Sequence, residues 1–88
     1  MNDFEVQFKK ETIRFLEKLD KDTSSRIFKK IKSMRTNPFP QGTKIVVGHK
    51  EKTFRLRVGK YRILYVTDFK RKTVIIIKID KRESVYDQ

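Results

Sequence analysis

The amino-acid sequence predicts one α+β domain, residues 1–88, in which an N-terminal strand and a helical hairpin pack on one face of a mainly antiparallel sheet of three to four strands. Two observations predict this class. Apolar residues recur at helical spacing in the first half of the chain and in short branched and aromatic runs in the second half. With 88 residues, of which 36% are hydrophobic, the chain is long enough for one small core.

The first half is predicted to form a strand followed by two helices. Phe4, Val6 and Phe8 alternate with polar residues, which is typical of a strand with one buried face. Two amphipathic helices are expected next, joined by a turn around residues 20–22, with the DTSS segment capping the second and Asn37-Pro38 following its end. Their apolar positions are Ile13, Phe15, Leu16 and Leu19 in the first helix and Ile27, Phe28, Ile31 and Met34 in the second.

The second half is predicted to be β-rich. From Lys44 onward, the runs KIVVG, TFRLRV, YRILYV and TVIIIKI consist of branched and aromatic residues bounded by turn formers. The order is therefore strand, helix, helix and then three or four strands, which places the helical hairpin on one face of the sheet.

The segment FRLRVGKYRILY specifies a hairpin register. A two-residue turn at Gly59-Lys60, with glycine at the position that needs a positive φ, pairs Val58 with Tyr61. A slip of one residue would mix the apolar and polar faces, so this register is strongly favoured. The pairs that follow are Leu56 with Ile63 and Phe54 with Tyr65 toward the helices, and Arg55 with Leu64 and Arg57 with Arg62 on the opposite face.

The facing arginines raise a question of charge. Arg57 and Arg62 repel each other in an isolated hairpin, because like charges at directly paired positions are destabilising. A bound phosphate favours the arrangement, since each guanidinium offers a planar fork of donors and stays ionised. The alternative is that both side chains fan into water. The formal net charge of +12 independently predicts a polyanionic partner, whether nucleic acid, acidic protein or anionic membrane surface.

The last strand is expected to extend both faces. In VIIIKIDKRESVY, alternation places Ile75, Ile77 and Ile79 on one face and Lys78, Asp80 and Arg82 on the other, basic face. The basic face also receives apolar residues toward its far end, so part of it is expected to be covered, and the end near Arg57, Arg62 and Arg82 is expected to be a pocket. Those apolar residues are Leu64, Val66, Val74 and Ile76.

Several function classes are disfavoured by composition. The chain has no cysteine, and hence neither a disulfide framework nor a zinc-finger spacing. No 18-residue apolar run and no signal-peptide pattern occur, so we expect a cytoplasmic protein without a membrane partner. Carboxylates near the basic face are limited to Asp80 and Glu83, so no metal and no cofactor are expected. His49, the sole histidine, is interpreted as a surface loop residue.

Two motifs carry a family resemblance that covers essentially the whole chain. The hairpin reads R-x-R-x-G-x-Y-R, and the C-terminal segment reads K-R-x-x-x-Y. Together with the preceding strand and helical hairpin, these motifs resemble the RelE/ParE toxin superfamily, and specifically its RelE-type members. The motif residues are Arg55, Arg57, Gly59, Tyr61, Arg62, Lys81, Arg82 and Tyr86.

The resemblance implies a type II toxin. RelE-type members are ribosome-dependent mRNA endonucleases that an antitoxin holds inactive, so the implied partners are an acidic, RelB-like antitoxin, the ribosome with its rRNA, and mRNA. ParE-type members share the fold but inhibit DNA gyrase without catalysis, and this remains the alternative. The implied catalytic residues are Arg57, Arg62, Arg82 and Tyr86, and the RNA-binding residues are Arg55, Lys78, Lys81, Lys29, Lys30 and Arg26.

Chemistry limits what these residues do. Cleaving RNA through its own 2′-hydroxyl requires a base, an acid for the leaving oxygen and stabilisation of charge at phosphorus. Arginine suits only the last task, because its pKa above ~12 makes it a poor base. Tyr86 is interpreted as a proton-transfer or base-stacking residue, with packing near the terminus as the alternative. The basic residues of the second helix form either a solvated face or an rRNA contact.

A third reading, a basic RNA-binding module without activity, is weaker. Such a module is expected to carry an aromatic surface on which single-stranded RNA bases stack. In the predicted register Phe54, Tyr61 and Tyr65 point into the core, so we expect no such surface.

Overall fold

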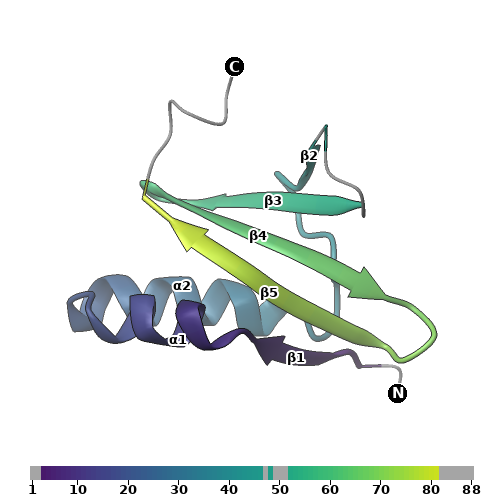
Figure 1. Ribbon diagram of the computed structural model, residues 1–88, viewed down its shortest axis with the longest axis horizontal. Helices are drawn as coiled ribbons and strands as arrows, with labels where there is room; N and C mark the ends of the chain where they lie inside the picture. Colours follow the sequence, from purple (N-terminus) through teal and green to yellow (C-terminus); the bar gives the residue numbers. More distant parts are fainter. Residues whose placement is uncertain (1–2, 47, 49–51, 82–88) are drawn as a thin grey trace.

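The predicted α+β architecture is confirmed by a computed structural model, which describes residues 3–46, 48 and 52–81 (Figure 1). In Figure 1 the helical hairpin lies along one side of a twisted sheet. The elements are strands β1 (Glu5–Phe8), β2 (Lys44–Val46), β3 (Thr53–Val58), β4 (Tyr61–Asp68) and β5 (Thr73–Asp80), and helices α1 (Lys10–Glu17) and α2 (Lys21–Ser33).

The described sheet has five strands in the order β1-β5-β4-β3-β2, one more than the upper limit of the sequence prediction. The additional member is β1, which joins the sheet at its edge and runs parallel to β5, with Phe8 opposite Ile76. Every other strand pair is antiparallel. The helical hairpin follows β1 directly and covers the core face, and β1 then forms one free edge of the sheet.

Helix α2 starts earlier than its sequence suggests. The carboxylate of Asp20 accepts a hydrogen bond from the backbone N–H of Thr23 at 3.0 Å, so Asp20 is the N-cap. This hydrogen bonding lowers the pKa of Asp20. The DTSS segment therefore lies inside the first turns of α2, and the prediction that it caps the helix is wrong. The helix ends at Ser33, before Asn37-Pro38 as expected.

The apolar faces of the helices are only partly buried. Ile27, Ile31 and Met34 have at most 1% of their surface exposed, as predicted. Ile13 and Phe28, by contrast, are 43% and 50% exposed. These two residues were predicted from helical spacing to belong to the core-facing stripes, and the structure shows them at the surface instead.

The predicted β3–β4 register is confirmed in full. Gly59 has a φ of 59°, as the first central position of a type II′ turn requires, and Val58 pairs with Tyr61. The remaining pairs are Leu56 with Ile63, Phe54 with Tyr65, Arg55 with Leu64, and Arg57 with Arg62.

A β-bulge in β5 overturns the predicted alternation of its isoleucines. Leu64 pairs with Lys78, but the next residue of β4, Tyr65, pairs with Ile76, so Ile77 is the extra residue. The bulge changes which residues face the helices: Val74, Ile76 and Ile79 belong to the core, whereas Ile75 and Ile77 are half-buried. The prediction that Ile75, Ile77 and Ile79 share a face, with Val74 and Ile76 opposite, is wrong for this reason.

One buried tyrosine ties a loop to the core. The hydroxyl of Tyr65 donates to the carbonyl oxygen of Pro38 at 2.6 Å and lies 3.3 Å from Oγ1 of Thr43. Burial raises the pKa of Tyr65, so its phenol remains a donor at neutral pH. Asn37 accepts a further hydrogen bond, from the N–H of Phe39, at 3.0 Å. The loop after α2 is therefore fixed against the sheet.

Neither helix in the described part of the chain is long and apolar enough to cross a membrane.

Candidate active site

The face of the sheet away from the helices carries a basic cleft beside β3. Lys44, Arg55 and Arg57 line it with Gly42, and its volume is ≈ 390 Å³. Arg57 and Lys44 are exposed, and Arg55 is half-buried. Among the residues that the structure describes, those that line the cleft include no carboxylate. Strand alternation predicted the two arginines, and the cleft has the charge required for a phosphate.

Lys44 is the member of this cleft that sequence reasoning missed. Its Cα pairs with that of Arg55 in the antiparallel β2–β3 ladder, so its side chain shares the open face. The sequence indicated a short strand that begins at Lys44, and β2 has only three residues. The residue of β3 that pairs with Lys44 could not be predicted, because the geometry of the turn between β2 and β3 was unknown.

Arg62 lies on the same face but is not exposed. Only 1% of its surface is accessible, which corrects the expectation that it lines an open pocket beside Arg57. Its Cα partner on β5 is Asp80, a half-buried residue. A carboxylate on the strand next to Arg62 offsets the repulsion that Arg57 exerts from the other side. The paired arginines therefore do not by themselves require a phosphate.

The prediction that only the far end of this face is covered is wrong, because burial extends to Arg62 and to its neighbour on the same face, Leu64. Leu64, which pairs with Arg55, is only 8% exposed. Lys78 remains at the surface opposite Leu64, and its Nζ lies 4.0 Å from Oδ2 of Asp80. Lys78 and Asp80 thus occupy the face predicted for them.

A second basic cleft lies on the helix side of the β3–β4 turn. It has a volume of ≈ 410 Å³, and its cationic lining residues are Arg26, Lys60 and Lys81. The structure therefore brings together two of the predicted RNA-binding residues, Arg26 and Lys81, which are far apart in the sequence, and adds Lys60. The two basic clefts flank the same hairpin end from opposite faces.

The remaining predicted site residues lie elsewhere. Lys29 is exposed and Lys30 half-buried on α2, and neither is among the residues that line the two basic clefts. Arg82 and Tyr86, predicted to be catalytic, lie outside the described residues, as do His49 and Glu83. Their roles stay predictions.

The aromatic residues of the predicted hairpin point into the core, whereas two phenylalanines outside the hairpin are exposed. Phe54 and Tyr65 are buried, and Tyr61 packs against Phe15 with ring centroids 6.0 Å apart, all as predicted. However, Phe39 and Phe69 are 37% and 57% exposed. Both come from turns, where strand and helix periodicity carry no information about burial.

Two connected apolar grooves lie on the hairpin side of the molecule. One, of ≈ 620 Å³, is lined in part by Phe8, Ile13, Leu16 and Phe28. The other, of ≈ 520 Å³, follows β1 and shares Phe8 and Phe28 with the first. The rings of Phe8 and Phe28 are stacked, with centroids 6.2 Å apart. The shared ring pair connects the two grooves, and the second of them is also lined by the charged residues Asp3, Glu5, Lys32 and Arg35.

The basic clefts are suited to holding phosphates and stabilising charge. Arginine and lysine side chains donate hydrogen bonds to phosphate oxygens and stabilise negative charge that develops during transfer. Across residues 3–46, 48 and 52–81, no three His, Cys, Asp or Glu side chains group as they would around a metal ion.

Comparisons with known proteins agree with this fold. The family described as "Phage derived protein Gp49-like (DUF891)" matches residues 14–88. RelE1 of Methanocaldococcus jannaschii is 31% identical over an alignment of 86 residues that covers 94% of this chain and 94% of that protein.

Solved structures agree as well. The archaeal RelE of a RelE–RelB complex from Pyrococcus horikoshii superposes with a TM-score of 0.81 and 23% identity, covering 93% of this chain and 98% of that one. The toxin–antitoxin complex RelBE2 of Mycobacterium tuberculosis gives 0.79 and 27%, covering 91% and 99%. The isolated E. coli RelE toxin gives 0.75 and 20%, covering 94% and 90%.

Proposed function

The chain belongs to the Gp49-like family of RelE-type toxins and is the toxin of a RelBE-type toxin–antitoxin system, and from this premise we propose that it cleaves mRNA on the ribosome. The observation that carries the proposal is the cleft of Lys44, Arg55 and Arg57, because it gathers three cations on the face that the helices leave open.

Each cation of this cleft has a role that matches its position. Arg57 is exposed at the hairpin end and is proposed to donate to the oxygens of the scissile phosphate as negative charge develops there. Lys44 and Arg55 are proposed to hold the neighbouring phosphates. Arg62, being buried beside Asp80, is proposed to position the Arg57 end of the hairpin rather than to touch RNA.

On the basis of the family resemblance, Tyr86 is proposed to transfer a proton, and Arg82 is proposed to stabilise the negative charge that develops on the phosphate. The 2′-hydroxyl must lose its proton as it attacks phosphorus, and the 5′-oxygen that leaves must gain one. Arginine keeps its proton at any physiological pH, so Arg57 and Arg82 serve the phosphate rather than these transfers.

Dependence on the ribosome follows from the same chemistry. In-line attack requires the 2′-oxygen, phosphorus and leaving oxygen to be aligned, and holding reactants in that geometry contributes a large part of the rate. The described lining of the cleft offers cations for phosphates but no aromatic side chain on which a base could stack. The ribosome is therefore proposed to fix the mRNA backbone against it.

The proposal is tested by primer extension on one mRNA, free and bound to translating ribosomes, with wild-type toxin. We expect strong cleavage of the ribosome-bound message and little cleavage of the free one. A gyrase supercoiling assay is run beside it. Inhibition of gyrase without mRNA cleavage would overturn the proposal in favour of a non-catalytic, ParE-type activity.

The antitoxin is proposed to bind the connected apolar grooves through an apolar segment flanked by acidic residues. Ile13 and Phe28 are large, apolar and about half exposed there, and β1 leaves one edge of the sheet free for a strand. The charge of +12 favours the acidic flanks.

This part is tested by titrating the antitoxin encoded beside the toxin into the wild type and into Phe28→Ala. The substitution should weaken binding, whereas Phe28→Leu, which keeps most of the apolar surface, should not. Affinity should also fall as salt rises. Unchanged binding by Phe28→Ala would place the antitoxin elsewhere without affecting the nuclease proposal.

A further inference from the structure

The turn between β4 and β5 combines features that the proposed active site does not use. Residues 69–72 read Phe-Lys-Arg-Lys, three cations next to an aromatic ring at the tip of a turn. Phe69 is 57% exposed, more than the exposed rings of Phe28 (50%) and Phe39 (37%). Phe39, another exposed ring, lies beside Phe69, so the two form an exposed aromatic patch next to these cations.

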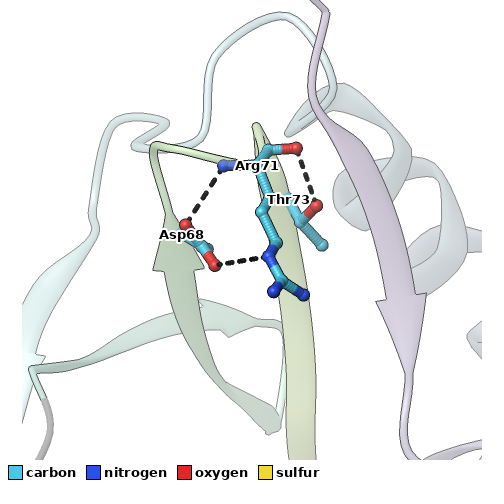
Figure 2. A network of polar contacts seen from close by, with 3 residues as sticks. All are labelled: Asp68, Arg71 and Thr73. Atoms are coloured by element: carbon cyan, nitrogen blue, oxygen red, sulfur yellow. Dashed lines mark hydrogen bonds and ion pairs between the residues drawn. The ribbon is translucent and has the colours of Figure 1, made fainter.

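The turn is held in one conformation by its own side chains. Figure 2 shows the carboxylate of Asp68 accepting the backbone N–H of Arg71 at 3.1 Å and lying 3.9 Å from Nε of Arg71. The hydroxyl of Thr73 donates to the carbonyl of Arg71 at 3.0 Å. These hydrogen bonds restrain the backbone that carries Phe69 and Lys70, which lowers the backbone entropy lost on binding.

The ring of Phe69 is held by a second loop. Its centroid lies 5.6 Å from that of Phe4, edge to face, and 5.8 Å from that of Phe39. Phe39 in turn packs on Phe54 at 4.7 Å. The loop that carries Phe39 is tied to the core by the hydrogen bond from Tyr65 to Pro38. Phe39 and Phe69 are therefore a fixed aromatic pair at the surface, supplied by two turns that are distant in the sequence.

The cations are arranged around this aromatic pair. Nζ of Lys72 lies 5.4 Å from the centroid of the Phe4 ring, a cation–π contact. Lys70 and Arg71 are exposed beside it. Asp68 is the one carboxylate in residues 68–73, and it is engaged with Arg71. The surface formed by Phe39, Phe69, Lys70, Arg71 and Lys72 is called the aromatic turn surface below.

We propose that the aromatic turn surface binds unpaired nucleotides of RNA, with a base stacked on Phe69 and its flanking phosphates on Lys70 and Arg71. Fixed aromatic rings next to cations are what single-stranded nucleic acid requires, because every base has a π-face and every linkage a charge. We favour RNA over an acidic peptide because the exposed rings and the three cations lie at the tip of a turn and not in a groove. The groove along β1, which Phe4 lines, adjoins this surface, so binding of a peptide there is one outcome of the test.

The site is separate from the basic clefts. Strand β4 has eight residues. Figure 1 shows the β3–β4 turn at one end of it and the β4–β5 turn, which carries Phe69 and the three cations, at the other. At about 3.3 Å per residue, the two ends are roughly 25 Å apart. The inference rests on the proposed function in one respect, since it takes ribosomal RNA as the physiological ligand and makes this surface a second anchor of the toxin on the ribosome.

The test measures binding of a single-stranded 2′-O-methyl oligoadenylate of about 12 nucleotides, which cannot be cut through a 2′-hydroxyl, to the full-length protein. Phe69→Ala should raise the Kd by about 5-fold to 100-fold, and Phe69→Trp should restore it. Lys70→Gln should reduce the slope of log K against log salt by about 0.7. The control is Lys10→Gln, which removes the same charge from an exposed lysine on α1, away from the aromatic turn surface.

Each outcome decides between the possibilities. Wild-type affinity in both Phe69→Ala and Lys70→Gln, with folding confirmed by circular dichroism, would overturn the inference, as would an equal loss in Lys10→Gln. A loss of antitoxin binding without a loss of RNA binding would make the surface a protein-docking site and also overturn it. Absence of ribosome-dependent cleavage by the wild type, with the Phe69 effect present, would remove the nuclease proposal and leave this site standing.

Discussion

On the helix-covered face of the sheet, Leu56, Ile63 and Tyr65 have at most 1% of their surface exposed, whereas on the open face Arg57 and Lys44 are exposed in a basic cleft. The two sets come from the same and neighbouring strands, because successive side chains of a strand point to opposite faces. Residues that stabilise the core and residues that line the cleft therefore alternate along the same strand. A substitution on one face should change the free energy of unfolding, and one on the other should change activity.

The largest effect is expected on the covered face. Ile63→Ala removes a fully buried side chain beside Leu56 and should lower the free energy of unfolding by about 2–5 kcal/mol. That is a large share of the roughly 5–15 kcal/mol typical of a small domain. Urea unfolding followed by circular dichroism measures it. If the free energy of unfolding fell by less than about 1 kcal/mol, Ile63 would not belong to a tightly packed core.

Arg82→Ala is expected to have the opposite effect, a loss of activity with little loss of stability. On the family resemblance Arg82 belongs with the open face, and removal of one donor to a developing oxyanion typically costs about 10²–10³ in rate. Growth inhibition and mRNA cleavage should nearly disappear, while the unfolding midpoint in urea should stay close to that of the wild type. Full toxicity at equal expression contradicts the assignment.

Tyr65→Phe should have an intermediate effect. It leaves the buried carbonyl of Pro38 without its donor and should cost about 1–3 kcal/mol of stability. Because burial raises the pKa of Tyr65, the folded state keeps a proton that the unfolded state releases above pH ~10. Its contribution is complete below that pH and is lost as pH rises further. Urea titrations at pH 8 to 11 should therefore show a steeper alkaline decline in the wild type than in Tyr65→Phe.

The smallest effect is expected for Lys44→Gln, which lies on the edge strand of the open face. The substitution should weaken binding of single-stranded RNA a few-fold and reduce the salt slope by about 0.7, with stability unchanged. Lys18→Gln, an exposed lysine at the end of α1, is the matched control. Equal losses in both variants indicate that overall charge, rather than the cleft, determines affinity.

The sequence was sufficient to predict the part of the fold that positions the basic cleft. Alternation in β3 and β4, together with one glycine at the turn, leaves a single register that keeps apolar residues on one side. The facing pair of Arg57 and Arg62 follows from it and is observed. Side-chain periodicity and turn chemistry are local properties, so one sequence can reveal them.

The failures have a common physical origin in longer-range structure. In the run VIII, residues 74–77, every side chain is apolar, so nothing local marks Ile77 as the bulge or assigns its neighbours to a face. The burial of Arg62 beside Asp80 depends on that same β4–β5 register. The exposure of Phe39 and Phe69 depends on how two turns meet, and no periodicity applies there.

The claim that the open face performs the chemistry is tested most directly by the rate of cleavage of ribosome-bound mRNA by Arg57→Ala, at concentrations matched for folded protein. The account predicts a fall of about 10²–10³ in the single-turnover rate, with the free energy of unfolding within about 1 kcal/mol of the wild type. Cleavage at the wild-type rate by the folded variant would contradict it, because the exposed arginine of the cleft would then have no part in stabilising the transition state.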